Sequence, residues 1–153
     1  EIINLIKSNS IYRTVRCDKI TIALLDDIIR SFEKNGFLKT NLSLELLTQS
    51  RKDLMIAANY IVDKIPSKLI DELGIEIIES MVEAGSGSLP EKNIRSIALK
   101  FKPSKYSVNH VSDHFRRSPK PIIGYIRKES YFIDLKAVLP HQKDNIVGAI
   151  KSI

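Results

Sequence analysis

The sequence predicts an α+β fold in which a mainly antiparallel sheet is flanked by helices. The first 65 residues carry apolar positions at helical spacing, whereas residues 75–79 and 95–102 are short, β-rich and partly alternating. Two apolar runs, 121–126 and 131–135, flank the polar residues 127–130 and have the form of a hairpin. With 153 residues and 43% apolar content, the chain is long enough for one sizeable core.

The first half of the chain is expected to be mainly helical. The sequence starts in a helical pattern without a capping residue and without methionine, so it reads as a fragment. Asp18 is a plausible N-cap for an amphipathic helix that Asn35-Gly36 ends. A longer helix is expected to begin near Thr48 or Ser50 and to be closed by Pro66. Without a sheet of their own, the first helices would leave an apolar face exposed.

Beyond Pro66 the pattern predicts the order strand, strand, helix, strand, strand, helix. The two strands at 75–79 and 95–102 come first, and a helix-like segment over 104–117 follows. The hairpin comes next, and the last helix is expected between residues 140 and 153. This order is typical of a layer domain with a mainly antiparallel sheet.

Composition excludes several classes of protein. The single cysteine, Cys17, cannot form an internal disulfide, and the usual spacings of a zinc site are absent. No apolar run is long enough to cross a bilayer, and the start does not resemble a secretory signal, so we expect a cytoplasmic protein. The formal charge of +6 favours phosphate or nucleic-acid contacts only modestly, because basic and acidic residues are interspersed.

Several segments, in this order, resemble the C-terminal portion of bacterial L-seryl-tRNA(Sec) selenium transferases (selenocysteine synthases). The matching residues are Arg13-x-x-Arg16 with Asp18-Lys19-Ile20-Thr21, Leu46-Leu47-Thr48, Gly85-Ser86-Gly87-Ser88-Leu89-Pro90, Pro121-Ile122-Ile123-Gly124-Tyr125-Ile126 and Asp134-Leu135. The family has the aspartate-aminotransferase-like fold, fold type I of pyridoxal-phosphate enzymes. The resemblance implies that residues 1–46 end the large catalytic domain, 47–65 form a connector helix and 66–153 form the C-terminal small α+β domain.

The same resemblance implies the function of the intact parent. Such enzymes use pyridoxal phosphate to convert seryl-tRNA(Sec) to selenocysteinyl-tRNA(Sec), with selenophosphate as the selenium donor. Their Schiff-base lysine lies upstream of the segment that this chain matches, so the chain alone is expected to be inactive and to bind no cofactor. The family also implies a homo-oligomer and no membrane association.

Arg13 and Arg16 are the best candidate site residues. Guanidinium groups offer paired donors that match phosphate oxygens and stay charged at any working pH. The resemblance implies that they hold the selenophosphate anion. A solvated or salt-bridged pair near a helix start is the alternative. The second candidate is the loop of Gly85, Ser86, Gly87 and Ser88, which could cradle an anion or the terminal adenosine of the substrate, or could be a plain strand connection.

The histidines suggest weaker candidates. His110 and His114 are four residues apart, a spacing that suits two metal ligands, but without a third ligand an exposed polar face is the favoured interpretation. The run from His114 to Arg117, with Lys120, could meet tRNA phosphates, although a solvated helix end is favoured.

Two other functions stay open at this stage. A related pyridoxal-phosphate lyase would share the fold but would have less use for Arg13 and Arg16. A free-standing module that binds RNA or a protein partner would use the basic balance of the chain instead.

Overall fold

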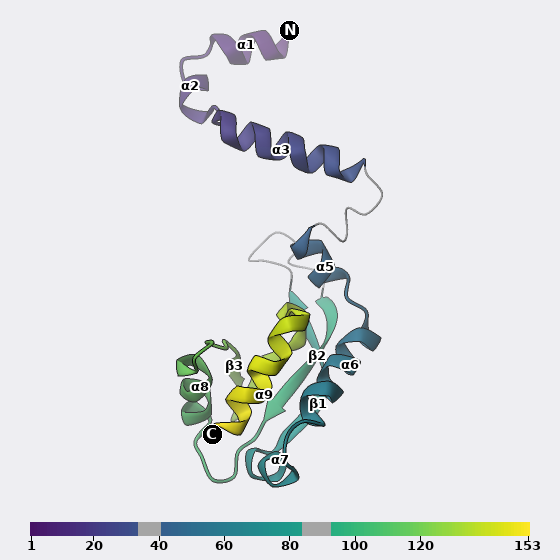
Figure 1. The fold of residues 1–153 in the computed structure, drawn as a ribbon. Helices are drawn as coiled ribbons and strands as arrows, with labels where there is room; N and C mark the ends of the chain where they lie inside the picture. Colours follow the sequence, from purple (N-terminus) through teal and green to yellow (C-terminus); the bar gives the residue numbers. More distant parts are fainter. Residues whose placement is uncertain (34–40, 84–92) are drawn as a thin grey trace. The chain divides into compact units, whose positions relative to one another are not determined.

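The computed structural model describes residues 1–33, 41–83 and 93–153. The chain divides into two compact units, residues 1–41 and 42–153, which we describe separately (Figure 1). None of the helices within the described ranges is long and apolar enough to cross a membrane.

The described residues of the first unit include the helices α1 (Ile2–Ser8), α2 (Tyr12–Val15) and α3 (Lys19–Phe32). Asp18 is the N-cap of α3, as predicted, because its side chain accepts hydrogen bonds from the backbone amides of Ile20 and Thr21. The helix ends at Phe32, and the expected stop at Asn35-Gly36 lies outside the described residues.

The apolar side chains of the first unit are exposed. None of the helices α1, α2 and α3 contains a buried residue, and Ile20, for example, is 73% exposed. The large apolar residues that remain exposed on α1 and α3 are Ile2, Ile3, Leu5, Ile6, Ile20, Ile22, Leu24, Leu25, Ile28, Ile29 and Phe32. The predicted exposed apolar face is thus present, and burying it would stabilise the unit by roughly 25 cal/mol per Å².

The second unit begins with α5 (Leu42–Thr48), α6 (Arg51–Val62) and α7 (Ser67–Leu73). The predicted helix start is confirmed at Ser50, whose hydroxyl accepts from the Asp53 amide and completes a capping box. Pro66 does not lead directly to a strand, because α7 begins immediately after it. The sequence pattern does not predict this helix, because its seven residues are too few for a clear period.

The four-stranded sheet is antiparallel throughout and has the order β1-β2-β4-β3. Its strands are β1 (Ile75–Glu83), β2 (Asn93–Phe101), β3 (Tyr125–Arg127) and β4 (Ser130–Asp134). The predicted strands and hairpin are confirmed, but β3 begins at Tyr125 rather than at residue 121. The backbone amide of Ile122 donates to the carbonyl of Phe115, which holds this segment against α8 (Val108–Arg117) instead of in the sheet.

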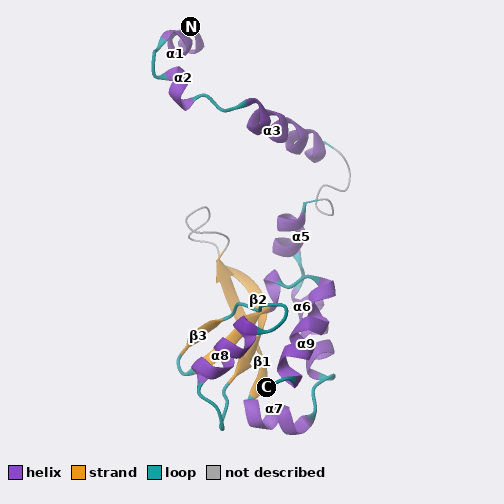
Figure 2. Ribbon diagram, turned by 60° about the vertical axis from the view of Figure 1, so that its left-hand side comes forward, coloured by secondary structure: helices purple, strands orange, loops and turns teal. Residues whose placement is uncertain are grey.

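The helices α6, α8 and α9 (Lys143–Lys151) bury one face of the sheet (Figure 2). The short 3-10 helices η1 (Leu135–Ala137) and η2 (Pro140–Gln142) lead from β4 to α9. At the centre, the Phe115 ring lies 5.3 Å from both the Phe101 and the Tyr131 rings, measured between centroids. Aromatic pairs at this separation contribute about 0.5–1.5 kcal/mol beyond the area they bury. The predicted α+β class with an antiparallel sheet flanked by helices is therefore confirmed.

The predicted domain limits concern the intact enzyme and stay a prediction. Within the chain itself, α6 lies in the core of the second unit, with its buried side chains packed together with those of the sheet. These side chains are Leu54, Ala57, Ala58 and Ile61.

Gly74 ends α7 in a left-handed conformation, with φ of 55°, and provides the first prediction. A Cβ atom there would overlap the carbonyl oxygen of Lys102 on the neighbouring segment. We expect Gly74→Ala to lower the free energy of unfolding by about 2 kcal/mol or more, because it adds backbone strain to a steric clash. Gly148→Ala in α9 is the matched control, since nothing lies within 4 Å of its added methyl group. Urea denaturation curves with equal midpoints for the two variants would contradict the prediction.

Candidate functional site

Arg13 and Arg16 lie at the end of a short helix in the first unit. Arg13 is in α2, and Arg16 caps its C-terminus with an extended backbone. Both side chains are exposed, and within the described ranges neither guanidinium forms an ion pair with a carboxylate. Their donors are thus open to an anion, but the anion site stays a prediction.

Asp18 is committed to capping and is not a partner of Lys19. Its carboxylate accepts from the amides of Ile20 at 2.8 Å and Thr21 at 2.9 Å, and from the Thr21 hydroxyl at 2.8 Å. These hydrogen bonds, chiefly those from Thr21, hold the pKa of Asp18 below its ordinary value. The two arginines therefore immediately precede a well-capped helix start.

The loop of Gly85, Ser86, Gly87 and Ser88 lies outside the described residues. The strands on either side of it pair in register, with Glu83 opposite Asn93. The proposed role of the loop in substrate binding stays a prediction.

The two histidines of α8 have separate surroundings. The His110 ring stacks on Tyr106, with centroids 5.3 Å apart. His114 Nε2 lies 2.9 Å from the carbonyl oxygen of Ala149, so this nitrogen carries a hydrogen and joins α8 to α9. No group of three or more His, Cys, Asp or Glu residues among the described positions could hold a metal ion.

Asp134, which belongs to one of the matching segments, accepts hydrogen bonds from two neighbouring strands on the face of the sheet opposite the helices. Ser80 and Ser96 lie directly across from each other on β1 and β2. Their hydroxyls donate to the two carboxylate oxygens of Asp134, at 2.6 and 2.5 Å. The backbone amide of Lys136 donates to the same carboxylate and begins η1. The Asp134 side chain on β4 therefore links β1 and β2 to η1, the 3-10 helix that follows the sheet.

Lys136 is a buried cation of the second unit, with 6% of its surface exposed. Its Nζ donates to the carbonyl oxygen of Gln49, between α5 and α6, at 2.7 Å. Burial lowers the pKa of this lysine from its ordinary value, and the Asp134 charge opposes that shift. The ammonium group thus fixes the start of α6 against η1.

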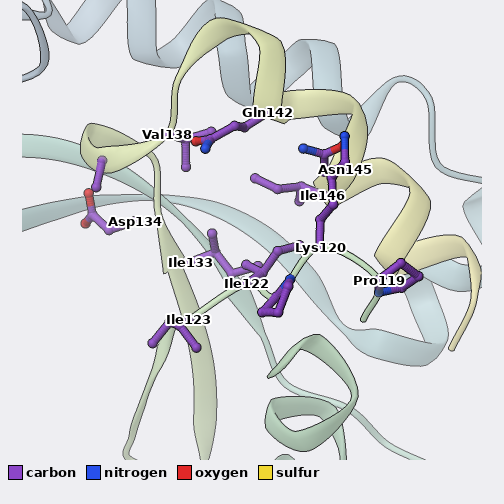
Figure 3. Close-up of a pocket in the computed structure, with 12 residues that line it drawn as sticks. Pro119, Lys120, Ile122, Ile123, Ile133, Asp134, Val138, Gln142, Asn145 and Ile146 are labelled. Atoms are coloured by element: carbon purple, nitrogen blue, oxygen red, sulfur yellow. The ribbon is translucent and has the colours of Figure 1, made fainter. Parts of the chain in front are cut away.

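A hollow of about 430 Å³ lies between the segment 119–123, the end of β4 and α9 (Figure 3). Figure 3 shows Ile122, Ile133 and Ile146 near its middle, with Lys120 and Asn145 beside them. This lining is mainly apolar, and the Gln142 side chain accepts from the amide of Leu139. The hollow has the size of a small-ligand pocket. Of the charged residues that line it, Asp134 already accepts hydrogen bonds from Ser80 and Ser96, and Lys120 is exposed.

Ser80, Ser96 and Lys136 were not predicted from the sequence. Serine and lysine are common residues, so none of the three stands out in the sequence. The contacts of the two serines with Asp134 depend on strand register. The polar positions of alternating strands were a usable signal, because a hairpin between 75–83 and 93–101 brings the two serines opposite each other.

The network around Asp134 gives a prediction about stability. Ser96 is only 2% exposed, so Asp134→Ala leaves a buried hydroxyl without its acceptor. We expect the free energy of unfolding to fall by about 1–3 kcal/mol. Adding Ser96→Ala should recover part of this loss, because the unsatisfied donor is then absent. Strictly additive losses in the double-mutant cycle, measured by urea denaturation, would rule out the coupling.

The cap at Asp18 gives a prediction about pH. Because the pKa is lower in the folded state, the cap stabilises α3 above the ordinary carboxyl value of 3.8 and is lost as pH falls through the lowered value. The Cα chemical shifts of Ile20 and Thr21 should therefore lose helical character in acid. Asp18→Asn keeps an acceptor without titrating, so its shifts should not follow this change. The same acid response in both proteins would exclude a capping origin.

Comparisons with known proteins agree with this arrangement of motifs. The sequence profile of the SelA family, L-seryl-tRNA selenium transferase, matches residues 1–139. The chain is 27% identical to the L-seryl-tRNA(Sec) selenium transferase of Desulfotalea psychrophila, over 99% of the chain and 32% of that protein. It is 32% identical to the protein of the same name from Sulfurimonas denitrificans, over 100% of the chain and 32% of that protein. The chain spans about a third of the length of these relatives. The chain belongs to the L-seryl-tRNA selenium transferase family.

Proposed function

We propose that this chain is the C-terminal portion of an enzyme that converts seryl-tRNA(Sec) to selenocysteinyl-tRNA(Sec) with selenophosphate. The family match over residues 1–139 carries the proposal. The matched relatives bear the name of the transferase rather than of a lyase, which favours this function over the lyase alternative. A cytoplasmic location follows from the proposal, because the aminoacyl-tRNA substrate is there.

The proposed parent uses pyridoxal phosphate, which acts as an electron sink during replacement of the seryl hydroxyl. Among the described lysines, Lys136 is buried but donates to a backbone carbonyl, and Lys64, Lys100 and Lys105 are in ion pairs, so none of these four is free to hold this cofactor. We therefore assign the cofactor and its lysine to parts of the intact enzyme outside this chain, as the family resemblance implies. The aspartate-aminotransferase-like fold belongs to the same proposal and agrees with the one-sided α+β unit.

In this proposal the first unit contributes Arg13 and Arg16 to the selenophosphate site. Their exposed guanidinium groups can each offer paired N–H donors to phosphate oxygens. The apolar side chains exposed on α1 and α3 would be covered by the rest of the enzyme or by another subunit, and the second arrangement agrees with the homo-oligomer that belongs to this proposal. The role of this unit is thus to hold the selenium donor, while proton transfers and bond changes take place elsewhere in the enzyme.

The experiment compares Arg13→Lys, Arg16→Lys and Arg16→Ala in the intact enzyme. Lysine keeps the charge but cannot bind in a bidentate manner. We expect the KM for selenophosphate to rise roughly tenfold or more in Arg16→Ala and by less in the lysine variants, since charge-assisted hydrogen bonds contribute about 1.5–3 kcal/mol. Seryl-tRNA affinity and the absorption band of bound cofactor should be unchanged.

Arg30→Ala is the matched control for this experiment. Arg30 lies in α3 of the same unit and pairs with Asp26 on its own helix, at 2.7 Å. It should leave the KM for selenophosphate at its original value. An Arg16→Ala enzyme with an unchanged KM would refute the anion site, and an intact enzyme that binds no pyridoxal phosphate would refute the proposed function itself.

A further inference from the structure

The face of the sheet opposite the helices carries a basic patch that the proposed function does not use. A hollow of about 530 Å³ opens over this face. Four cations line it: Lys100 on β2, Lys102 just after β2, Arg127 at the end of β3 and Lys128 in the following turn. We refer to these four residues and Tyr125 as the open-face patch.

The positive charge of this patch is only partly neutralised. Lys100 pairs with Glu76 at 2.7 Å, and Lys102 adds to the field that lowers the pKa of the same carboxyl. Glu79 also lines the hollow, but its carboxylate binds Arg51 of α6. Within the described ranges Lys102, Arg127 and Lys128 form no ion pair, and all three are exposed. The patch thus has three cations available to an anionic partner.

Aromatic surface accompanies these cations. Tyr125 lies directly across from Phe132 in the β3–β4 hairpin, and their rings stack with centroids 5.2 Å apart and planes 12° apart. Tyr125 remains 43% exposed on β3, the last strand in the sheet order. Cations that track a phosphate backbone, beside an exposed ring that can stack on a base, are the combination by which proteins bind single-stranded nucleic acid.

The two-residue turn between β3 and β4 fixes the positions of Arg127 and Lys128 relative to the sheet. Lys128 and Glu129 both have positive φ, of 47° and 55°, as a tight hairpin turn requires. The turn places Arg127 directly opposite Ser130, with Lys128 next to it at the rim of the hollow. The register of β2 with β4 sets Lys100 opposite Phe132. Residues 100–102 and 125–128 are far apart in the sequence. They lie close together because β2 and β3 both pair with β4.

We infer that the open-face patch binds a single-stranded segment of RNA, its cations contacting phosphates and Tyr125 stacking on a base. This inference rests on the proposed function, which supplies an RNA substrate, and it assigns part of the contact with that substrate to this face. Charge complementarity favours RNA over a protein surface, because the unpaired charges that line the hollow, those of Lys102, Arg127 and Lys128, are all positive and lie beside an exposed ring. Glu129 of the same turn and Asp134 of the same face do not line the hollow.

The test measures binding of the 153-residue chain to a fluorescent single-stranded RNA of about 12 nucleotides by anisotropy, over a range of salt concentrations. In the triple variant Lys102→Ala/Arg127→Ala/Lys128→Ala the affinity should fall about tenfold or more. The slope of log K against log salt should become shallower by about 2, which corresponds to three lost phosphate contacts on a single strand. Tyr125→Ala should weaken binding about tenfold at unchanged slope, and Tyr125→Phe should restore it.

The matched control removes the same charge elsewhere, as Arg116→Ala/Arg117→Ala/Lys120→Ala at the C-terminal end of α8. These three residues are also exposed, and they were the RNA candidates of the sequence analysis. The control should keep the affinity and the salt slope of the original chain. Loss of binding in the control, but not in the open-face variant, would overturn the inference, as would absence of binding at low salt or an equal loss in both variants. Thermal melting at the original temperature shows that each variant is folded.

The same open-face substitutions in the intact enzyme separate this inference from the proposed function. If both hold, the KM for seryl-tRNA rises while the KM for selenophosphate stays constant. Selenium transfer with an unchanged KM for seryl-tRNA would overturn the inference and leave the proposed function standing. RNA binding through the patch, in an intact protein without transferase activity, would refute the proposed function and support the inference.

Discussion

Burial of one face of the antiparallel sheet is the constraint on which the second unit depends. Phe101 and Tyr131 of the sheet pack on Phe115 of α8, and α6 and α9 complete the same layer. A shift of one residue in any strand would turn these side chains to the other face, so their burial fixes the register. The register in turn decides which polar residues share the opposite face, where Asp134 and the open-face patch lie.

Polar contacts then tie this layer to the elements around it. Asp134 receives the hydroxyls of Ser80 and Ser96, and the neighbouring Lys136 reaches the carbonyl of Gln49. These groups are half-buried or buried, where an unpaired polar atom costs more free energy than a satisfied one gains. The match of Asp134-Leu135 to the family therefore has a physical meaning: the carboxylate fixes the strands, and the leucine is buried in the core.

The first unit has the opposite character. Its helices are well formed, with a capped start at Asp18, but their apolar side chains are exposed. Arg13 and Arg16 form no ion pair in the described part of the chain, whereas Arg30 pairs with Asp26. Exposed apolar helix surfaces of this kind are typical of segments that another part of a protein or a partner covers. This arrangement agrees with a proposed division of labour, in which this chain supplies anion and RNA contacts to chemistry performed elsewhere in the enzyme.

The sequence by itself determined the α+β class, the cap at Asp18, the strands and the family, because periodicity, capping and motif order are local properties of the chain. It limited the start of the next long helix to Thr48 or Ser50, and the structure selects Ser50. The sequence did not predict α7, which is too short for a clear period. It also placed the start of β3 four residues too early, because the backbone amide of Ile122 bonds to the carbonyl of Phe115 instead of joining the sheet. Only the tertiary structure decided that Lys102, Arg127 and Tyr125 share one surface. Alternation assigns residues to a face, whereas neighbours across strands depend on pairing and register, which the buried core sets.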